Sequence, residues 1–375
     1  MKIIQIRSET KKLIKELKPV YNSYSEMSPS EQEFLTEIIR RHKPKKLLEL
    51  GVSAGSSSVL ILNAIRDIPD SRLTSIDYST YYYRDKTKNS GFVVDEYPAL
   101  ESNWTLYTGF VASEFMDKIG GDIDFAFIDT MHLLPGEVID ILLVLPYLKP
   151  DAVLVFHDTN LHTVEHSPQF TANNMLVSAI SGEKLVPETF ESVFFFNPRK
   201  TDVQMGFPNI TGVRLDGTQT DRVWDIFNLL TQKWKYMPKS NDIESIRRSF
   251  KKHYSDFYVQ MFDNILSYQM NKAKNEQTIR DVIRNNSKLI ETKSRENIQA
   301  NKTLFASLQK ESRLRFIYDH IWSFCLLKWR FYFCKCLSYG KKRDKYRAKY
   351  KAVRDMIRAA AKFRRSVWQN YLPEK

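Results

Sequence analysis

Short apolar runs alternate with helical patterns through the first half of this 375-residue chain. Each run has the length of a strand and ends near a glycine or a polar residue. This pattern predicts strands at about 46–50, 72–77, 104–107, 124–128 and 152–156. Nearly continuous apolar strands joined by helices are typical of a parallel sheet with both faces covered. Two later runs, Ser192–Phe196 and Thr211–Leu215, are expected to complete the sheet.

Helical signals lie between these runs. Ser30-Glu31-Gln32-Glu33 fits a capping box and predicts a helix that ends near Lys43-Pro44. Residues 56–66 and 135–145 predict two further helices. Residues 81–102 lack the helix expected between the second and third strands, so this connection is predicted to be irregular.

The first predicted strand leads into a glycine-bearing turn that reads E-x-G-x-x-x-G-S, from Glu49 to Ser56. Gly51 lets the backbone turn tightly and approach a ligand, and Gly55 lets the next helix begin close to the strand. The dinucleotide fingerprint G-x-G-x-x-G is absent. Asp77 follows roughly twenty residues later, where α/β folds place an acid on a ribose. The turn therefore predicts a nucleotide-like ligand, and the alternative is an ordinary strand-to-helix connection.

Acid and imidazole groups follow the fourth and fifth predicted strands. Asp129 and His132 come after one strand, and His157 and Asp158 come after the other. Ligands of open α/β sheets bind at the carboxyl ends of the strands, so these two loops are expected to be neighbours in a site. The alternative is that the side chains only cap the strand ends.

These motifs together resemble the class I S-adenosylmethionine-dependent methyltransferases. The loops Ile128–His132 and Phe156–Thr159 resemble the I-D-G-x-H and F-H-D-T loops of a bacterial subfamily, with Thr130 in place of the usual glycine. The resemblance covers residues 28–215. It implies a Rossmann-like, seven-stranded, mostly parallel sheet with helices on both faces and an antiparallel last strand. It also implies S-adenosylmethionine as cofactor, held by residues that include Glu49, Gly51, Gly55, Ser56, Asp77 and Asp129.

Transfer of a methyl group to a hydroxyl requires that the hydroxyl lose its proton. An imidazole near neutrality suits this task, so His132 or His157, with Asp158 beside them, is expected to be catalytic. Related O-methyltransferases hold a divalent cation with carboxylates after these strands, which makes Asp129 and Asp158 candidate ligands for Mg²⁺ or another divalent cation. Those relatives usually carry an Asp-Asn pair where this chain has His157-Asp158. Metal dependence is therefore left open.

Charge divides the chain. Residues 1–240 carry 26 basic and 31 acidic residues, whereas residues 241–375 have a net charge of +18. We expect a methyltransferase domain at 1–240, a helical connector at 241–311 and an aromatic, basic, amphipathic tail at 312–375. Self-association through the connector is one possibility, although its apolar positions do not follow a coiled-coil repeat.

The tail mixes aromatic residues with Lys and Arg, 16 basic against 3 acidic in residues 321–375. This composition suits an anionic membrane surface. The alternatives are packing of the aromatic residues on the core, or nucleic acid, which the acidic first 240 residues disfavour. The three cysteines form neither a disulfide framework nor a zinc motif, and no run is long enough to span a membrane. We therefore expect a cytoplasmic protein, peripheral on the inner face of the cell membrane.

The tail also resembles the aromatic and basic tails of bacterial capsule and lipopolysaccharide assembly enzymes. The resemblance includes the Tyr-Gly-Lys-Lys-Arg sequence at Tyr339–Arg343. The expected function is therefore O-methylation of a sugar or glycan hydroxyl in surface-glycan biosynthesis. Alternatives are a natural-product or RNA methyltransferase, or a non-catalytic binding module with a degenerate methyltransferase fold. The acceptor, the methylated position and the oligomeric state do not follow from the sequence.

Overall fold

The computed structural model forms two compact units, Met1–Lys274 and Asn275–Lys375. The residues that the structure describes are 1–164, 169–189, 191–193, 202–204, 208–217, 219, 223–300, 329, 332, 344, 347–349, 351, 354 and 355. Most of the predicted tail, 312–375, thus lies outside the described residues. No helix in the described part of the chain is long and apolar enough to cross a bilayer.

The first unit is built on a sheet that has eight strands among the described residues, in the order β1-β9-β12-β8-β7-β2-β3-β6. Strand β12 is antiparallel to both β8 and β9, while the other neighbouring pairs are parallel. The bounds are Lys2–Ile4 (β1), Lys46–Leu50 (β2), Arg72–Asp77 (β3), Trp104–Thr108 (β6), Ile123–Ile128 (β7), Leu148–Phe156 (β8), Gly182–Pro187 (β9) and Thr211–Leu215 (β12). The expected mostly parallel sheet and its antiparallel last strand are confirmed.

Two strand predictions were wrong. The sheet has eight described strands instead of seven, because β1 adds to the edge of β9. The strand next to β12 is β9 and not Ser192–Phe196. Ser192 lies in β10 (Glu191–Val193), which pairs with β11 (Asp202–Gln204) in a separate two-stranded sheet, and residues 194–196 are outside the described part. The sequence pattern favoured Ser192–Phe196 because its phenylalanines make it more apolar than β9, whose sequence Gly-Glu-Lys-Leu-Val-Pro is half polar.

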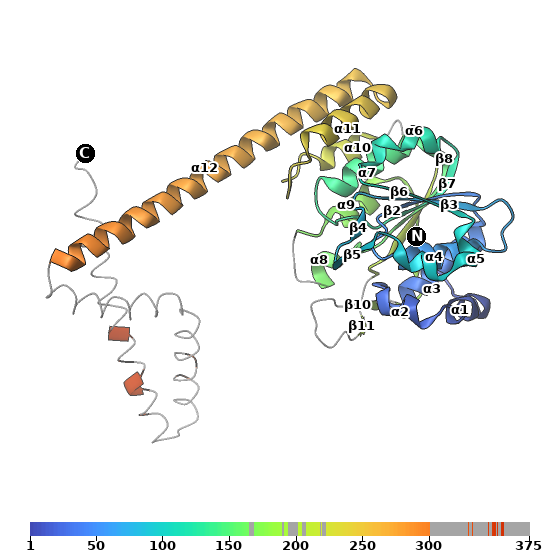
Figure 1. The fold of residues 1–375 in the computed structure, drawn as a ribbon, viewed down its shortest axis with the longest axis horizontal. Helices are drawn as coiled ribbons and strands as arrows, with labels where there is room; N and C mark the ends of the chain where they lie inside the picture. The colour runs from blue at the N-terminus through green and yellow to red at the C-terminus, as the bar shows by residue number, and fades with distance from the viewer. Residues whose placement is uncertain are drawn as a thin grey trace. The chain divides into compact units, whose positions relative to one another are not determined.

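Helices cover both faces of the sheet (Figure 1). Their bounds are Ser8–Lys15 (α1), Pro19–Tyr24 (α2), Pro29–His42 (α3), Ser56–Ile65 (α4), Pro98–Glu101 (α5), Met116–Ile119 (α6), Gly136–Val144 (α7), Leu161–Val164 (α8), Ala172–Ala179 (α9), Val223–Leu229 (α10), Ser240–His253 (α11) and Asp256–Ala300 (α12). The connection after β3 is irregular, as the sequence predicted. It contains the hairpin strands β4 (Tyr81–Tyr82) and β5 (Asp85–Asn89), the 3₁₀ helix η1 (Phe92–Glu96) and the four-residue helix α5, which the sequence did not predict individually.

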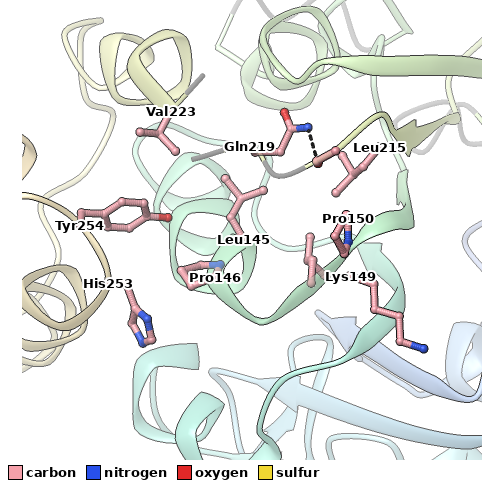
Figure 2. Close-up of a pocket in the computed structure, with 11 residues that line it drawn as sticks. Leu145, Pro146, Lys149, Pro150, Leu215, Gln219, Val223, His253 and Tyr254 are labelled. Atoms are coloured by element: carbon pink, nitrogen blue, oxygen red, sulfur yellow. Dashed lines mark hydrogen bonds between the residues drawn. The ribbon is translucent and has the colours of Figure 1, made fainter. Parts of the chain in front are cut away.

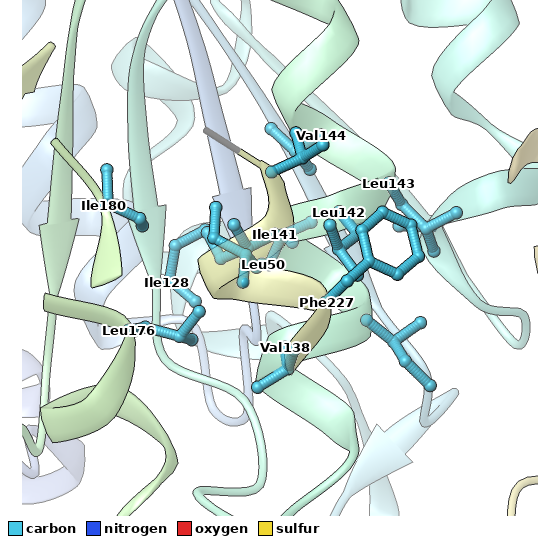
Figure 3. Packing of buried hydrophobic residues seen from close by; sticks show 14 of the residues in the cluster. Leu50, Ile128, Val138, Ile141, Leu142, Leu143, Val144, Leu176, Ile180 and Phe227 are labelled. Carbon is cyan, nitrogen blue, oxygen red and sulfur yellow. The ribbon is translucent and has the colours of Figure 1, made fainter. Parts of the chain in front are cut away.

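Alternate residues of the central strands belong to two separate cores. Leu48 and Ile128 pack with helices α7, α9, α10 and α11, and Figure 3 shows part of this core around Val138 and Phe227. Leu47 packs on the other face with helices α1 to α4. Burial of both faces explains why the strands read as continuous apolar runs instead of alternating ones.

Helix α3 begins two residues earlier than the sequence indicated. Its cap is Ser28, whose hydroxyl accepts from Glu31 N, while the Glu31 carboxylate accepts from Ser28 N at 2.7 Å. The capping box predicted at Ser30 was therefore wrong by two positions. Pro29 sits at the first helical position, where its fixed φ suits a helix start and its missing N–H costs nothing.

Candidate functional site

The residues predicted for the site lie at the carboxyl ends of β2, β3, β7 and β8. These four strands are consecutive in the parallel part of the sheet, in the order β8-β7-β2-β3. The glycine turn follows β2, Asp77 ends β3, and the two acid and imidazole loops follow β7 and β8. The topology thus brings the predicted residues to one edge of the sheet.

Both turn glycines have left-handed φ angles, +89° at Gly51 and +95° at Gly55. A Cβ at Gly51 would lie 1.9 Å from the carbonyl oxygen of Asp129, and one at Gly55 would lie 2.8 Å from Gly91 Cα. The glycines therefore allow close approach of the chain's own backbone. Gly55 packs on Gly91, not on the strand as expected.

The Asp77 carboxylate is hydrogen-bonded to the backbone of the glycine turn. Its Oδ2 accepts from the N–H groups of Val52 (2.9 Å) and Ser53 (2.8 Å), and its Oδ1 accepts from Ser79 N (2.7 Å). Each carboxylate oxygen can accept two hydrogen bonds, so Oδ1 retains capacity for a hydroxyl donor. Asp77 thus holds the turn and keeps a lone pair for a ligand.

The beginning of helix α4 has unsatisfied polar groups. Gly55 is the N-cap residue and has no side chain to accept from the first-turn N–H groups. Ser56 is 6% exposed, and its Oγ has no hydrogen-bond partner among the described residues. A buried orphan hydroxyl next to an uncapped helix N-terminus fits the carboxylate or amine of an amino-acid ligand. These residues therefore fit the methionine part of S-adenosylmethionine.

Glu49 lies beneath the turn and is fully buried. Its carboxylate accepts from the hydroxyls of Ser57, Ser58 and Ser75, each at 2.6 Å. Burial raises the pKa of Glu49 to about 7, although the three hydroxyls act in the opposite direction. Its contacts in the structure are thus with the protein, and they tie α4 to β3.

Asp129, His132 and Asp158 form a cluster in which one ligand atom from each lies within 4.8 Å of the others. His132 Nε2 is 3.3 Å from Asp158 Oδ2 and 3.7 Å from Asp129 Oδ1. His132 and Asp158 have left-handed φ angles of 57° and 53°, which is uncommon outside glycine and typical of functional sites. Two carboxylates and an imidazole are a donor set that fits a divalent cation.

His157 differs from His132 in being enclosed. Its side chain is 3% exposed, with Nδ1 3.2 Å from Asp129 Oδ1 and Nε2 3.5 Å from Glu31 Oε2. Burial lowers the pKa of His157, but Asp158 and Asp129 outweigh it and raise this pKa well above its ordinary value. The ring therefore lies between carboxylates, and an acid faces each of its nitrogens.

Two further acids on α7 were not predicted. The backbone N–H of His132 donates to Glu137 Oε1, and Thr130 Oγ1 donates to Asp140 Oδ2 at 3.1 Å. Burial, with Glu137 nearby, raises the pKa of Asp140 to about 7, and burial also raises the pKa of Glu137. Their sequence signal was two acids in a helix that is otherwise almost entirely apolar.

Glu31 and Asn209 also reach the cluster, from outside the two predicted loops. Both are nearly fully buried. Asn209 Nδ2 donates to Asp158 Oδ1 (2.7 Å) and lies 3.3 Å from Glu31 Oε1. Glu31 was visible in the sequence only as part of a capping motif, and Asn209 carried no signal.

One exposed aromatic side chain, Tyr83, is linked to the cluster through Glu26. Tyr83 is 57% exposed and donates to Glu26 Oε1 (2.7 Å), a carboxylate that interacts electrostatically with Asp129 and Asp158. Met131, within the β7 loop, is also exposed. The pocket drawn in Figure 2 lies elsewhere: it is lined by Lys149, His253 and Tyr254, where β8 begins, and its residues are not those of the predicted site.

Residues 48–159 match the family model of a methyltransferase domain. This range contains the glycine turn, Asp77 and both acid and imidazole loops. No curated protein sequence matches the chain.

Solved structures with a similar chain path include two O-methyltransferases and one putative O-methyltransferase. One is TomG from Streptomyces achromogenes, involved in tomaymycin synthesis and solved with S-adenosylmethionine (16% identity, 57% of this chain and 92% of that chain, TM-score 0.39). Another is a putative O-methyltransferase from Klebsiella pneumoniae (15% identity, 57% and 98%, TM-score 0.40). The third is from Bacillus cereus, solved with S-adenosylhomocysteine (14% identity, 56% and 92%, TM-score 0.34).

Proposed function

We infer that this chain belongs to the class I S-adenosylmethionine-dependent methyltransferases, and we propose that it transfers the methyl group to a hydroxyl oxygen. The family match carries the inference, because the matched range contains the whole glycine turn. The orphan hydroxyl of Ser56 and the free acceptor capacity of Asp77 support binding of the cofactor there. S-adenosylmethionine supplies an electrophilic methyl group on a positively charged sulfur.

Calorimetry with S-adenosylhomocysteine tests the cofactor site. Asp77→Ala removes the predicted ribose contact and frees the N–H groups of Val52 and Ser53, so we expect binding at least about tenfold weaker. Asp85→Ala, on the exposed β5 hairpin, is the matched control and should bind like wild type. Unchanged affinity for Asp77→Ala would remove the ribose assignment. Failure of wild type to bind would favour the non-catalytic binding module.

We propose that Asp129, His132 and Asp158 hold a divalent cation such as Mg²⁺. Further acids beside the cluster support this: Glu137 Oε1 lies 3.6 Å from His132 Nδ1, and Glu31 Oε2 lies 3.5 Å from His157 Nε2. A bound cation would lower the pKa of an acceptor hydroxyl. The protein's own residues contact the two carboxylates: Asn209 Nδ2 donates to Asp158 Oδ1 at 2.7 Å, and His157 Nδ1 lies 3.2 Å from Asp129 Oδ1.

Chelation separates this arrangement from metal-free catalysis. Treatment with a chelator should abolish methyl transfer, and added Mg²⁺ or Mn²⁺ should restore it. Activity that persists after chelation would instead make His132 the general base, because it is the less enclosed imidazole and is oriented by Asp158 at 3.3 Å.

We propose a sugar hydroxyl of a bacterial surface glycan as acceptor. The exposed rings of Tyr81 and Tyr83 support this, since flat aromatic faces with polar tips suit sugar rings. Loss of about one methyl group per repeat from the surface glycan of a deletion strain would support the assignment. A glycan of unchanged mass would favour a natural-product or RNA acceptor.

We further propose that residues 312–375 hold the enzyme at the inner face of the cell membrane. The basic excess and the interleaved aromatic residues of that segment support attraction to anionic headgroups. Nucleic acid as a partner is disfavoured by the acidic character of residues 1–240. The connector 241–311 remains a candidate for self-association.

A further inference from the structure

The two carboxylates of the cluster are linked to a single buried acid on another element. Glu31 lies in the first turn of α3, before the range that matches the methyltransferase domain. It is 1% exposed. An ionised carboxylate is buried at this level only when charged or hydrogen-bonding partners compensate for the lost hydration. Its partners therefore indicate what it does.

One set of partners leads to Asp129. Glu31 Oε2 lies 3.5 Å from His157 Nε2, and the opposite ring nitrogen of His157 lies 3.2 Å from Asp129 Oδ1. The imidazole thus lies between two carboxylates. Its contact with Glu31 is an ion-pair distance, because Nε2 has no hydrogen-bond partner among the described residues.

The other set leads to Asp158. Glu31 Oε1 lies 3.3 Å from Asn209 Nδ2, which donates to Asp158 Oδ1 at 2.7 Å. An amide nitrogen has two N–H donors, so Asn209 can serve both carboxylates at once. The amide oxygen of Asn209 accepts from Asn160 N at 2.9 Å, which fixes the amide orientation.

We propose that Glu31 is a positioning residue that holds Asp129 through His157 and Asp158 through Asn209, and so sets the geometry of the cation site. This inference rests on the proposed function of the cluster. Capping of α3 does not require the charge, because glutamine serves equally well at the third position of a capping box. Capping also does not explain why Oε2 lies 3.5 Å from His157 Nε2 or why Oε1 lies 3.3 Å from Asn209 Nδ2.

Glu31→Gln is the informative variant, because it retains the acceptor for Ser28 N and removes the charge opposite His157. Glu33→Gln is the matched control: it changes the same residue type on the same helix, where Glu33 pairs with Lys11 at 3.5 Å. Three quantities are measured on the full chain: Mn²⁺ affinity by electron paramagnetic resonance, S-adenosylhomocysteine affinity by calorimetry, and the melting temperature.

We expect Glu31→Gln to bind Mn²⁺ about tenfold or more weakly, as is usual when a residue that orients a metal ligand is changed. Its affinity for S-adenosylhomocysteine should match wild type, since the glycine turn is untouched, and Glu33→Gln should match wild type in both. Mn²⁺ affinity equal to wild type in Glu31→Gln would overturn the proposal. Asn209→Ala provides the second arm if Glu31→Gln does not fold, with the same expectation for Mn²⁺.

The experiment can disprove the proposed cation site separately from the proposed positioning role of Glu31. If wild type binds S-adenosylhomocysteine but no Mn²⁺, the proposed cation is wrong, and crystal structures of wild type and Glu31→Gln then decide. Displaced His157 and Asp129 side chains would support the positioning role. Superposable side chains in the two structures would overturn it.

Discussion

At the scale of single residues, the two glycines of the turn are required by contacts within the protein that the sequence motif did not indicate. Gly51 was predicted to let the backbone approach a ligand, and Gly55 to let the next helix begin close to the strand. In the structure their missing Cβ atoms make room for the backbone of Asp129 and Gly91. The glycine turn thus packs directly on the loop that follows β7. The proposed cofactor site and the cluster are therefore joined through the contact between Gly51 and Asp129.

Gly51→Ala should destabilise the protein by about 3 kcal/mol or more, since the new Cβ would overlap a backbone oxygen and the φ of +89° disfavours alanine. Urea denaturation monitored by circular dichroism measures the change. Gly121→Ala is the control, because a Cβ there meets nothing within 4 Å. If Gly51→Ala were as stable as Gly121→Ala, the loop that follows β7 would be able to move away from the new Cβ at little cost in free energy.

Glu49 should make stability depend on pH. Its folded-state pKa is raised by burial from 4.5 to about 7, so the folded protein binds more protons than the unfolded chain between these values. The free energy of unfolding therefore falls as pH rises from about 4.5 to 7, by up to about 3 kcal/mol from this residue, and levels off above 7.

Glu49→Gln should reduce the slope of this part of the profile, as urea denaturation at a series of pH values would show. Some slope should remain, because burial also raises the pKa of Asp140 to about 7. Glu9→Gln, at an exposed position of α1, should keep the wild-type slope. Parallel profiles for Glu49→Gln and wild type would mean that Glu49 stays ionised when buried.

At the scale of elements, the sequence located the central strands of the first unit almost to the residue. Strands β2, β7 and the end of β8 are largely apolar runs buried on both faces, and such runs are recognisable without tertiary information. Strand β3 is only one-third apolar. Strands β1 and β9 were missed because β1 has three residues and the apolar residues of β9 lie only in its second half. The apolar pattern therefore located the interior of the sheet and not its edge.

The site shows the same division. Asp77, Asp129, His132, His157 and Asp158 follow strands, so their convergence could be predicted from the topology. Glu31 and Asn209 could not be predicted, because they reach Asp158 and His157 across sequence separations that no local pattern encodes. The different roles of the two histidines also depend on these contacts.

Helix α11 belongs to the first unit by packing, although its charge suggested the connector. Phe250 is fully buried, with its ring centroid 5.3 Å from that of Phe227 and 5.1 Å from that of Phe262. Phe250→Ala should cost about 3–5 kcal/mol in urea denaturation. Phe257→Ala, at a position 58% exposed, should cost much less. Equal losses would mean that α11 contributes little to the core.

At the scale of the whole molecule, composition placed the end of the catalytic domain at 240, whereas the first compact unit ends at Lys274. The difference arises because charge patterning reports exposed surface, and α11 is basic on its exposed side while burying Ile246 and Phe250. Net charge is thus a poor guide to where a core ends.

Flotation with liposomes containing anionic lipid tests the tail. The full chain should float with the liposomes and lose this at high salt, because screening weakens attraction between basic residues and headgroups. A chain lacking residues 312–375 should stay in the soluble fraction. Equal recovery of both proteins in the soluble fraction would count against membrane docking.

The contact between Gly55 and Gly91 has a consequence for the timing of ligand exchange. Gly91 N–H donates to Ser53 O (2.9 Å) and Val93 N–H donates to Ala54 O (3.0 Å), so the segment that follows the Tyr83 hairpin is joined to the cofactor turn by its backbone. A movement of the turn that releases the proposed cofactor should therefore also move the β4–β5 hairpin. We expect the demethylated cofactor and the methylated product to dissociate together. Slowed hydrogen exchange at the Gly91 and Val93 amides would then report an occupied donor site.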